Sequence, residues 1–270
     1  MSRYLSPNEI ASISTLLSAP RLGTYLAITR TRTFVDAIEL HQATMSLGIA
    51  IMAVTGLIEV SLRNAVCHEL DNALQINGWL RNPPQSLKWS ALEVYAIKKA
   101  EQQARRAIYS KMTNAEKVAL DALAFPNGVP VGIKHRKLAE KRQTSINPVS
   151  DGQIIAHLTM HFWKRLFSEN YEQTLWKRAL KKIFPNKTLT RAMIASHLEA
   201  IYEVRNRLAH HEPVYGSRLD AILESIDFMT HNFGSVKPSA ETPLAKLILP
   251  QRDILAGQVA IFKATFERLT

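Results

Sequence analysis

The chain has 270 residues, 46% of them hydrophobic, and a formal net charge of +11 at pH 7. This length allows a substantial core in one large or two small domains. The single cysteine, Cys67, excludes an intrachain disulfide and a cysteine-based zinc site. The excess of Lys and Arg favours a polyanionic partner, which could be RNA, DNA or an anionic membrane surface.

Helical patterns follow one another along the first half of the chain. Ser6 and Glu9 have the spacing of a capping box, with Pro7 in the first turn, and predict a short helix to about residue 17. Further helices are predicted over residues 21–29, 34–76, 87–110 and 114–123. The 34–76 helix has apolar residues around so much of its surface that we expect it to be central. The 87–110 helix includes the basic residues Lys98, Lys99, Arg105 and Arg106.

A loop and a basic run separate the two halves. Residues 125–132 contain two Pro and two Gly and predict a loop. The densest basic run follows, which is either a solvated, mobile surface segment or an RNA contact through Lys134, Arg136, Lys137, Lys141 and Arg142.

The second half is again helical in pattern. Helices are predicted over 151–167, 171–184, 188–208, 217–232 and 252–269, with a proline-rich loop before the last. The sequence has no strand alternation, internal repeat or glycine-rich phosphate loop. We therefore predict an all-α fold in a single helical domain over residues 1–270, with 252–269 as the C-terminal helix.

Residues 40–58 raise the question of a membrane span, because they contain no Asp, Glu, Lys or Arg. A spanning helix needs about 20 predominantly apolar residues. This stretch includes His41, Thr44 and Thr55 and runs directly into Glu59, so a buried core helix is the better interpretation. The first eight residues lack the pattern of a signal peptide. We expect a cytoplasmic protein without membrane contact.

The most informative segment is residues 202–213, Tyr-Glu-Val-Arg-Asn-Arg-Leu-Ala-His-His-Glu-Pro. Asn206 and His210 are four residues apart and share a helix face. Arg205 and His210 lie about 140° apart around an ideal helix. They converge only if Arg205 swings over or the helix unwinds near His210, which Pro213 makes plausible.

These residue types suit cleavage of RNA by attack of a ribose 2′-hydroxyl on the adjacent phosphate. Histidine titrates near neutral pH and can transfer the proton. Arginine stays charged and can bind two phosphate oxygens, and asparagine can orient the imidazole or bind a phosphate oxygen. The alternative is a basic helix C-terminus, where Arg and His interact well with the helix dipole.

The motif of Arg205, Asn206 and His210 resembles the Arg-x4-His signature of the HEPN superfamily, and its surroundings resemble the Abi-like branch of that superfamily. Two further segments are similar to that branch: residues 56–64, Gly-Leu-Ile-Glu-Val-Ser-Leu-Arg-Asn, and residues 162–167, Phe-Trp-Lys-Arg-Leu-Phe. The likeness covers roughly residues 37–215, and the region after Gly216 adds nothing to it.

The resemblance implies an HEPN-like helical bundle with a core over roughly residues 34–235 and additional peripheral helices. It implies a metal-independent endoribonuclease toxin of bacterial abortive infection, which needs no cofactor and leaves a 2′,3′-cyclic phosphate. His210 would be the general acid or base, Arg205 would bind the phosphate, and Asn206 would orient a partner group. A homodimer and an RNA or protein antitoxin are the implied partners. The alternative is a non-catalytic RNA-binding or sensing module of a defence system.

Several other residues are candidates for lesser roles. Arg63, Asn64 and His68 repeat the motif's spacing and could form a second half-site, although they lie inside a long apolar helix. Glu59 and Arg63 can pair with each other on one face of that helix and can also support the motif, and His211 can touch the site. His157 and His161 have the spacing of a helical metal pair, but no third ligand is evident, so we expect no metal site.

Overall fold

The computed structural model describes residues 5–270, so the first four residues of the stretch judged to lack a signal peptide lie outside it. Helices and loops make up the described chain, and no strand occurs within it. The prediction of an all-α fold is therefore confirmed.

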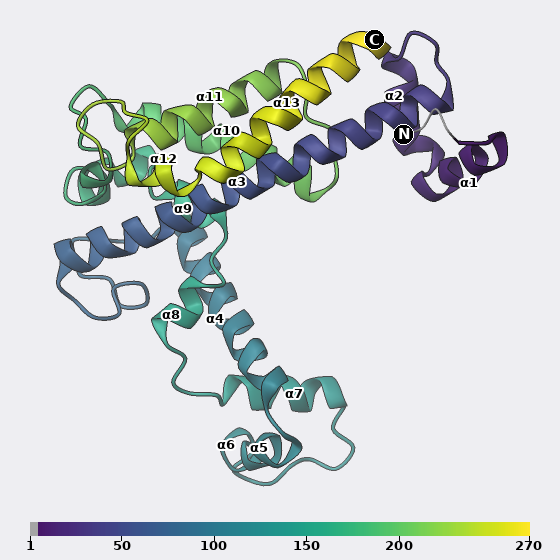
Figure 1. Cartoon of the computed structure of the whole chain (residues 1–270). Helices are drawn as coiled ribbons and strands as arrows, with labels where there is room; N and C mark the ends of the chain where they lie inside the picture. Colours follow the sequence, from purple (N-terminus) through teal and green to yellow (C-terminus); the bar gives the residue numbers. More distant parts are fainter. Residues whose placement is uncertain (1–4) are drawn as a thin grey trace. The chain divides into compact units, whose positions relative to one another are not determined.

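The helices fall into two compact units (Figure 1). The first unit comprises residues 5–66 together with Lys181–Thr270, and the second comprises Cys67–Leu180. The long helix α3 passes from one unit into the other. The two units differ in which residues contact one another, and this does not test whether they fold as one domain. The single-domain organisation therefore stays a prediction.

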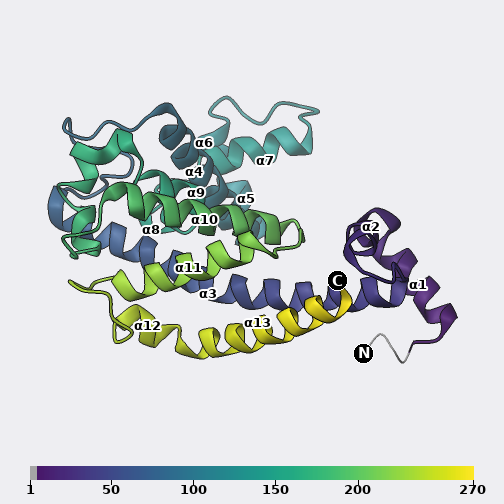
Figure 2. The same ribbon diagram turned by 90° about the horizontal axis from the view of Figure 1, so that it is seen from above.

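The first unit is a layered arrangement of long helices (Figures 1 and 2). It contains α1 (Pro7–Leu17), α2 (Ala19–Ile28), the greater part of α3 (Phe34–Leu74), α10 (Arg191–Ala209), α11 (Ser217–Asn232), α12 (Pro243–Leu247) and α13 (Leu249–Leu269). The most extensive contact joins α10 to α11. The predicted capping box of α1 is present, with reciprocal bonds between Ser6 and Glu9.

Helix α3 contributes a long buried face to this core. Residues at helical spacing along it are fully buried, among them Ile51, Val54, Ile58 and Leu62. Helix α10 approaches it closely at Gly48, where an added Cβ would lie 2.8 Å from Leu208 Cδ2. A side chain at residue 48 would therefore require the end of the Leu208 side chain to move.

By length and composition alone, α3 could cross a membrane. In its most apolar 18-residue window, 44% of the residues are nevertheless buried within the molecule. Thr44 and Thr55 are also buried in this helix, and each hydroxyl donates to the carbonyl four residues earlier. Part of α3 therefore lies in the core of the first unit.

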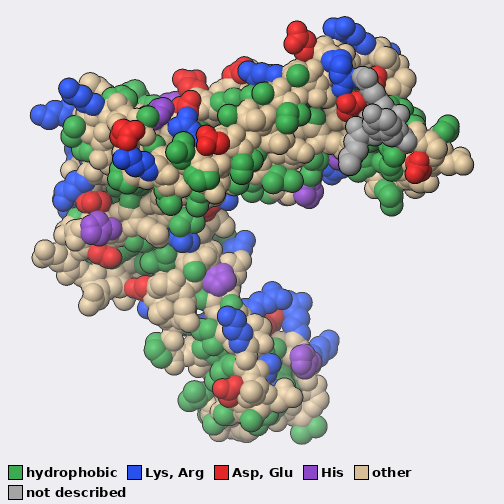
Figure 3. All heavy atoms as spheres, viewed as in Figure 1, with side chains coloured by type: hydrophobic (Ala, Val, Ile, Leu, Met, Phe, Trp, Pro, Cys, Tyr) green, Lys and Arg blue, Asp and Glu red, His purple; other side chains and the backbone are tan. Residues whose placement is uncertain are grey.

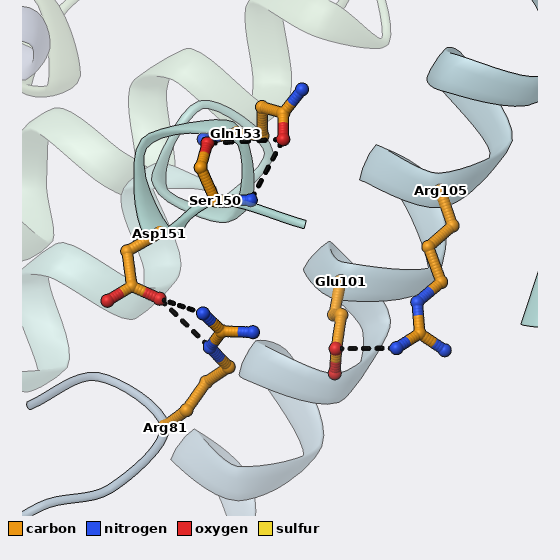
Figure 4. Close-up of polar contacts among 6 residues, drawn as sticks. All are labelled: Arg81, Glu101, Arg105, Ser150, Asp151 and Gln153. Carbon is orange, nitrogen blue, oxygen red and sulfur yellow. Dashed lines mark hydrogen bonds and ion pairs between the residues drawn. The ribbon is translucent and has the colours of Figure 1, made fainter. Parts of the chain in front are cut away.

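The second unit is built on α4 (Ala91–Lys111), which contacts α7 (His135–Thr144) and α8 (Asp151–Ile155). Its remaining elements are α5 (Asn114–Ala119), α6 (Asp121–Ala124), α9 (Met160–Arg165) and the short turns Glu169–Tyr171 and Glu172–Trp176. The aromatic ring of Trp89 contacts those of Trp79, Phe162 and Tyr171. An ion pair between Arg81 and Asp151 ties the loop before α4 to the start of α8 (Figure 4).

Two predicted helices are broken into shorter pieces. The predicted 151–167 helix is interrupted between α8 and α9, where Thr159 adopts an extended backbone as the N-cap of α9. The predicted 171–184 helix is a series of π and 3₁₀ turns, Glu172–Trp176 and Leu180–Ile183. Burial of Phe162, Trp163, Leu175 and Trp176 accompanies these breaks. Packing of large side chains thus overrides the regular α-helical repeat here.

Other boundaries differ in smaller ways. The predicted 114–123 helix is divided into α5 and α6, and the 87–110 helix begins only at Ala91. The basic run forms helix α7, and the proline-rich loop contains the short helix α12, neither of which was predicted. Arg142 of α7 pairs with Asp121 of α6, and this ion pair ties the polar helix α7 to its neighbour.

Candidate functional site

The predicted motif lies at the C-terminal end of α10. Thr190 caps the start of this helix, its side chain accepting a hydrogen bond from the Met193 amide. One stripe of the helix is buried in the core, namely Ile194, Leu198, Ile201 and Val204. This stripe fixes the rotation of the helix, and with it the directions in which Arg205 and Asn206 leave it.

Helix α10 ends in a Schellman motif, a pair of hydrogen bonds that closes a helix around a left-handed residue. The amide of His211 donates to the Leu208 carbonyl at 2.9 Å, and the amide of Glu212 donates to the Arg207 carbonyl at 2.8 Å. His211 has φ +56°, in the region that favours glycine. Its carbonyl accepts a hydrogen bond from Arg21 of α2 at 2.8 Å. The Schellman hydrogen bonds and the contact from Arg21 thus both stabilise the left-handed backbone at the end of α10.

Replacing His211 with glycine should therefore stabilise the protein by about 0.5–1 kcal/mol, because glycine adopts the left-handed conformation without steric cost. Thermal unfolding of the purified variant measures this effect. The matched control, His211→Ala, keeps a Cβ at the strained position and should bring no gain. A glycine variant no more stable than the alanine variant would contradict the backbone explanation.

Arg205 is held by an acidic residue of the neighbouring helix. Its Nη1 donates to the Glu59 carboxylate on α3, and the two side chains are only 21% and 17% exposed. Arg205 Nε is buried without a hydrogen-bond partner, so the guanidinium has donor capacity that Glu59 does not use. The expected supporting role of Glu59 thus corresponds to a direct contact, and the Arg205 side chain is restrained.

Asn206 and His210 are exposed at the same helix end. His210 is the C-cap, with φ −93° and ψ 10°, so the helix unwinds there as the sequence suggested it could. No hydrogen bond or ion pair joins either side chain to another residue within 5–270. Both side chains are therefore available to a ligand, and the side chains of Arg205, Asn206 and His210 make no hydrogen bonds with one another.

Arg63 does not pair with Glu59, contrary to the pairing that their spacing suggested. Its Nε instead lies 3.5 Å from Oδ1 of the adjacent Asn64, while Glu59 contacts Arg205. The His68 ring contacts Asn72 at 3.0 Å on the same helix, which continues without a break to Leu74. The residues of the proposed second half-site thus lie in regular mid-helix, unlike those at the end of α10.

The remaining candidates are placed as follows. His157 lies in the turn after α8 and His161 lies in α9, so they do not share one continuous helix as their spacing suggested. No group of three or more potential metal ligands occurs among the described residues. Glu212, next to His211, forms an ion pair with Arg207 at 3.0 Å. The contact from Arg21 had no signal in the sequence, because it joins residues 190 positions apart.

Comparison with known proteins places these features in a family. No curated protein and no solved structure gives a significant match to the chain. A family model described as Abi-like protein matches residues 18–216, a span that includes α2 to α10 with Glu59, Arg205 and His210. Since the match covers most of the chain, this protein belongs to the Abi-like family.

Proposed function

We propose that this protein is a metal-independent endoribonuclease of the HEPN type. One observation carries the proposal: a restrained arginine and an exposed histidine whose side chain has no hydrogen-bond partner occupy the same helix end. Glu59 restrains Arg205, and His210 stands where α10 unwinds. A fixed cation and a free imidazole are the two groups that transesterification of RNA needs in the absence of a metal.

The reaction begins with attack of a ribose 2′-oxygen on the adjacent phosphorus. A bond forms between that oxygen and phosphorus, the bond from phosphorus to the 5′-oxygen breaks, and a 2′,3′-cyclic phosphate and a 5′-hydroxyl remain. One proton leaves the 2′-hydroxyl and one is delivered to the departing 5′-oxygen. His210 transfers one of these protons, and Arg205 neutralises charge that develops on the phosphate oxygens.

Glu59 acts through Arg205. A guanidinium has five N–H donors, and the contact with Glu59 uses one nitrogen of the group. The carboxylate therefore fixes the direction of the cation while donors remain for phosphate. Such preorganisation lowers the cost of placing the charge when the reaction occurs. Asn206, exposed one residue further along α10, can bind a phosphate oxygen or orient the imidazole.

Each chain supplies one motif histidine, whereas the reaction benefits from both a base and an acid. We therefore propose a homodimer in which two copies of the motif face one another and contribute one imidazole each. Membership of the Abi-like family suggests involvement in abortive infection. Within that setting the protein would be a cytoplasmic toxin restrained by an RNA or protein antitoxin.

Incubation of the purified protein with a defined RNA should yield fragments ending in a 2′,3′-cyclic phosphate and a 5′-hydroxyl. Cleavage should proceed at the same rate in EDTA, because the motif offers no cluster of metal ligands. Mapping of both fragment ends, with and without the chelator, measures this. Activity that disappears in EDTA and returns with a divalent cation would reject the mechanism. Binding of RNA without cleavage would favour a sensing module instead.

A further inference from the structure

The second unit contains the most basic part of the chain. Residues 98–144 hold eleven of the 34 Lys and Arg residues but only four of the 23 Asp and Glu residues. They extend from the middle of α4 to the end of α7. Most of the protein's net positive charge therefore comes from a small fraction of its sequence.

All four acidic residues of this segment have partners within it. Glu101 pairs with Arg105 at 2.9 Å (Figure 4), and Glu140 pairs with Arg136 at 2.9 Å. Asp121 accepts two hydrogen bonds from Arg142, each of 2.7 Å. The fourth, Glu116, accepts hydrogen bonds from Thr113 in the capping box of α5. The segment thus has no acidic group left to neutralise its other cations.

Seven cations of the segment are exposed and form no ion pair within the described residues: Lys98, Lys99, Arg106, Lys111, Lys134, Lys137 and Lys141. We call these seven side chains the α4–α7 basic surface. Figure 3 shows Lys and Arg side chains gathered over the part of the second unit where Figure 1 places α7. Arg136 and Arg142, which the sequence also suggested as RNA contacts, are engaged by Glu140 and Asp121 and lie outside this set.

The lysines of α7 form a row. Lys134 is the N-cap of the helix, and Lys137 and Lys141 follow it at spacings of three and four residues, on one face. At a rise of 1.5 Å per residue, they are separated by about 4.5 and 6 Å along the axis. Helix α7 is tied to α4 where Arg105 Nη1 donates to the Thr144 carbonyl at 3.4 Å. The row is therefore carried on an anchored element.

We propose that the α4–α7 basic surface binds the sugar–phosphate backbone of the RNA substrate at nucleotides away from the scissile bond. A row of exposed cations without counterions matches a chain of phosphates, and phosphate contacts dominate the affinity of such complexes. The inference rests on the proposed endoribonuclease function, because it assigns to the protein a second surface that binds the same RNA substrate. The backbone contacts would hold RNA without reading its sequence.

The composition of α7 argues against a membrane as the anionic partner. Its ten residues include only two apolar ones, Leu138 and Ala139, and both are half-buried against the body of the unit. A helix that lies in a membrane interface needs an apolar face to insert. Helix α7 has no exposed apolar face, whereas binding to phosphates requires only its charged face.

The test replaces the row and measures binding apart from cleavage. Lys134→Gln, Lys137→Gln and Lys141→Gln are combined in a His210→Ala chain, which preserves the RNA during titration. With a fluorescein-labelled single-stranded RNA, affinity at about 0.1 M salt should fall by roughly tenfold. The slope of log Kd against log salt should decrease by about 2, since each single-strand phosphate contact contributes roughly 0.7.

A matched control removes the same charge elsewhere, through Lys187→Gln, Lys237→Gln and Lys263→Gln, three exposed lysines of the first unit. This control should change affinity less than about twofold. A triple Lys→Arg replacement in α7 should retain binding, since it preserves the charge. Equal losses in the α7 and control variants would overturn the proposal by showing that only net charge matters.

Two further outcomes separate this proposal from the proposed function. Unchanged RNA affinity in the α7 variant would reject the surface, even if the unmutated chain cleaves RNA. RNA binding that depends on the α7 lysines, in a chain that never cleaves, would retain the surface and reject the endoribonuclease. Loss of binding to phosphatidylserine vesicles, with RNA affinity intact, would instead identify a membrane contact and overturn the proposal.

Discussion

Replacing His210 with alanine should lower the rate of RNA cleavage by about 10²–10⁴-fold, the usual contribution of a general acid or base. The variant should unfold at nearly the same temperature as the unmutated protein, because the His210 side chain is exposed and forms no hydrogen bond. Cleavage kinetics and thermal unfolding on the same preparations measure both effects. Together they separate a catalytic role from that of a basic helix C-terminus, since the latter predicts a loss of stability.

His68→Ala is the matched control, because His68 is also exposed and belongs to the second copy of the Arg-Asn-x3-His spacing. Its cleavage rate should be unchanged. A His210→Ala protein that cleaves RNA at the full rate would reject the role of His210. A monomer that loses activity with His68→Ala would favour an intrachain second half-site over the homodimer.

The same variant tests whether active sites are shared between subunits. Chains carrying His210→Ala, mixed with chains carrying Arg205→Ala, should regain part of the activity if each composite site needs one intact residue of each kind. Since Arg205 also contacts Glu59, the folded state of its variant has to be verified by thermal unfolding. Complete inactivity of a confirmed mixed dimer would contradict sharing of the two residues.

Replacing Glu93 with glutamine should destabilise the protein by about 3 kcal/mol, the largest stability effect that we expect. The Glu93 side chain on α4 is 1% exposed and accepts hydrogen bonds from Arg165, Ser90 and Tyr171. Glutamine keeps the size but removes the charge, which leaves Arg165, whose side chain is 21% exposed, without its counterion. Thermal unfolding should show a decrease of roughly 6–12 °C in Tm.

The control is Asp151→Asn, which neutralises a carboxylate in the more exposed ion pair with Arg81 (Figure 4). Because such pairs contribute little, this change should cost less than about 1 kcal/mol. Similar losses in the two variants would show that burial does not strengthen the Glu93 interaction. A Glu93→Gln protein as stable as the unmutated one would reject the prediction.

The contribution of Glu93 should also depend on pH. Burial alone would raise the pKa of Glu93, but the hydrogen bonds from Arg165, Ser90 and Tyr171 outweigh it and hold this pKa below its usual range. A depressed pKa in the folded state gives stability that is present above the unfolded pKa, about 4.3, and is lost as the pH falls through the folded value. The stability difference between the unmutated protein and Glu93→Gln should therefore be constant at neutral pH and shrink below about pH 4.

The residues that contact Glu93 include part of a segment that resembles Abi-like proteins in sequence. Arg165 lies in the segment 162–167, and Tyr171 follows it closely, but both side chains contact Glu93 on α4. Phe162 and Trp163 of the same segment are buried. These residues hold the second unit together, whereas Arg205 and His210 lie at an accessible helix end in the first.

The sequence by itself determined the all-helical architecture and the position of the candidate motif. Helices α1, α10 and α11 carry strong local signals, because a capping residue or apolar residues at helical spacing act within a few positions of one another. The exposure of Asn206 and His210 follows from the same periodicity, since the buried stripe of α10 leaves these positions outside the core.

Only the tertiary structure decided which groups surround the motif. Glu59 and Arg63 are near enough in sequence to pair, yet Glu59 contacts Arg205, 146 positions away. The left-handed backbone of His211 is likewise accompanied by a contact from Arg21 on another helix. The breaks in the predicted 151–167 and 171–184 helices accompany the burial of large aromatic side chains. Local propensities of a few tenths of a kcal/mol are smaller than these long-range packing and ion-pair energies, so the sequence pattern could not settle them.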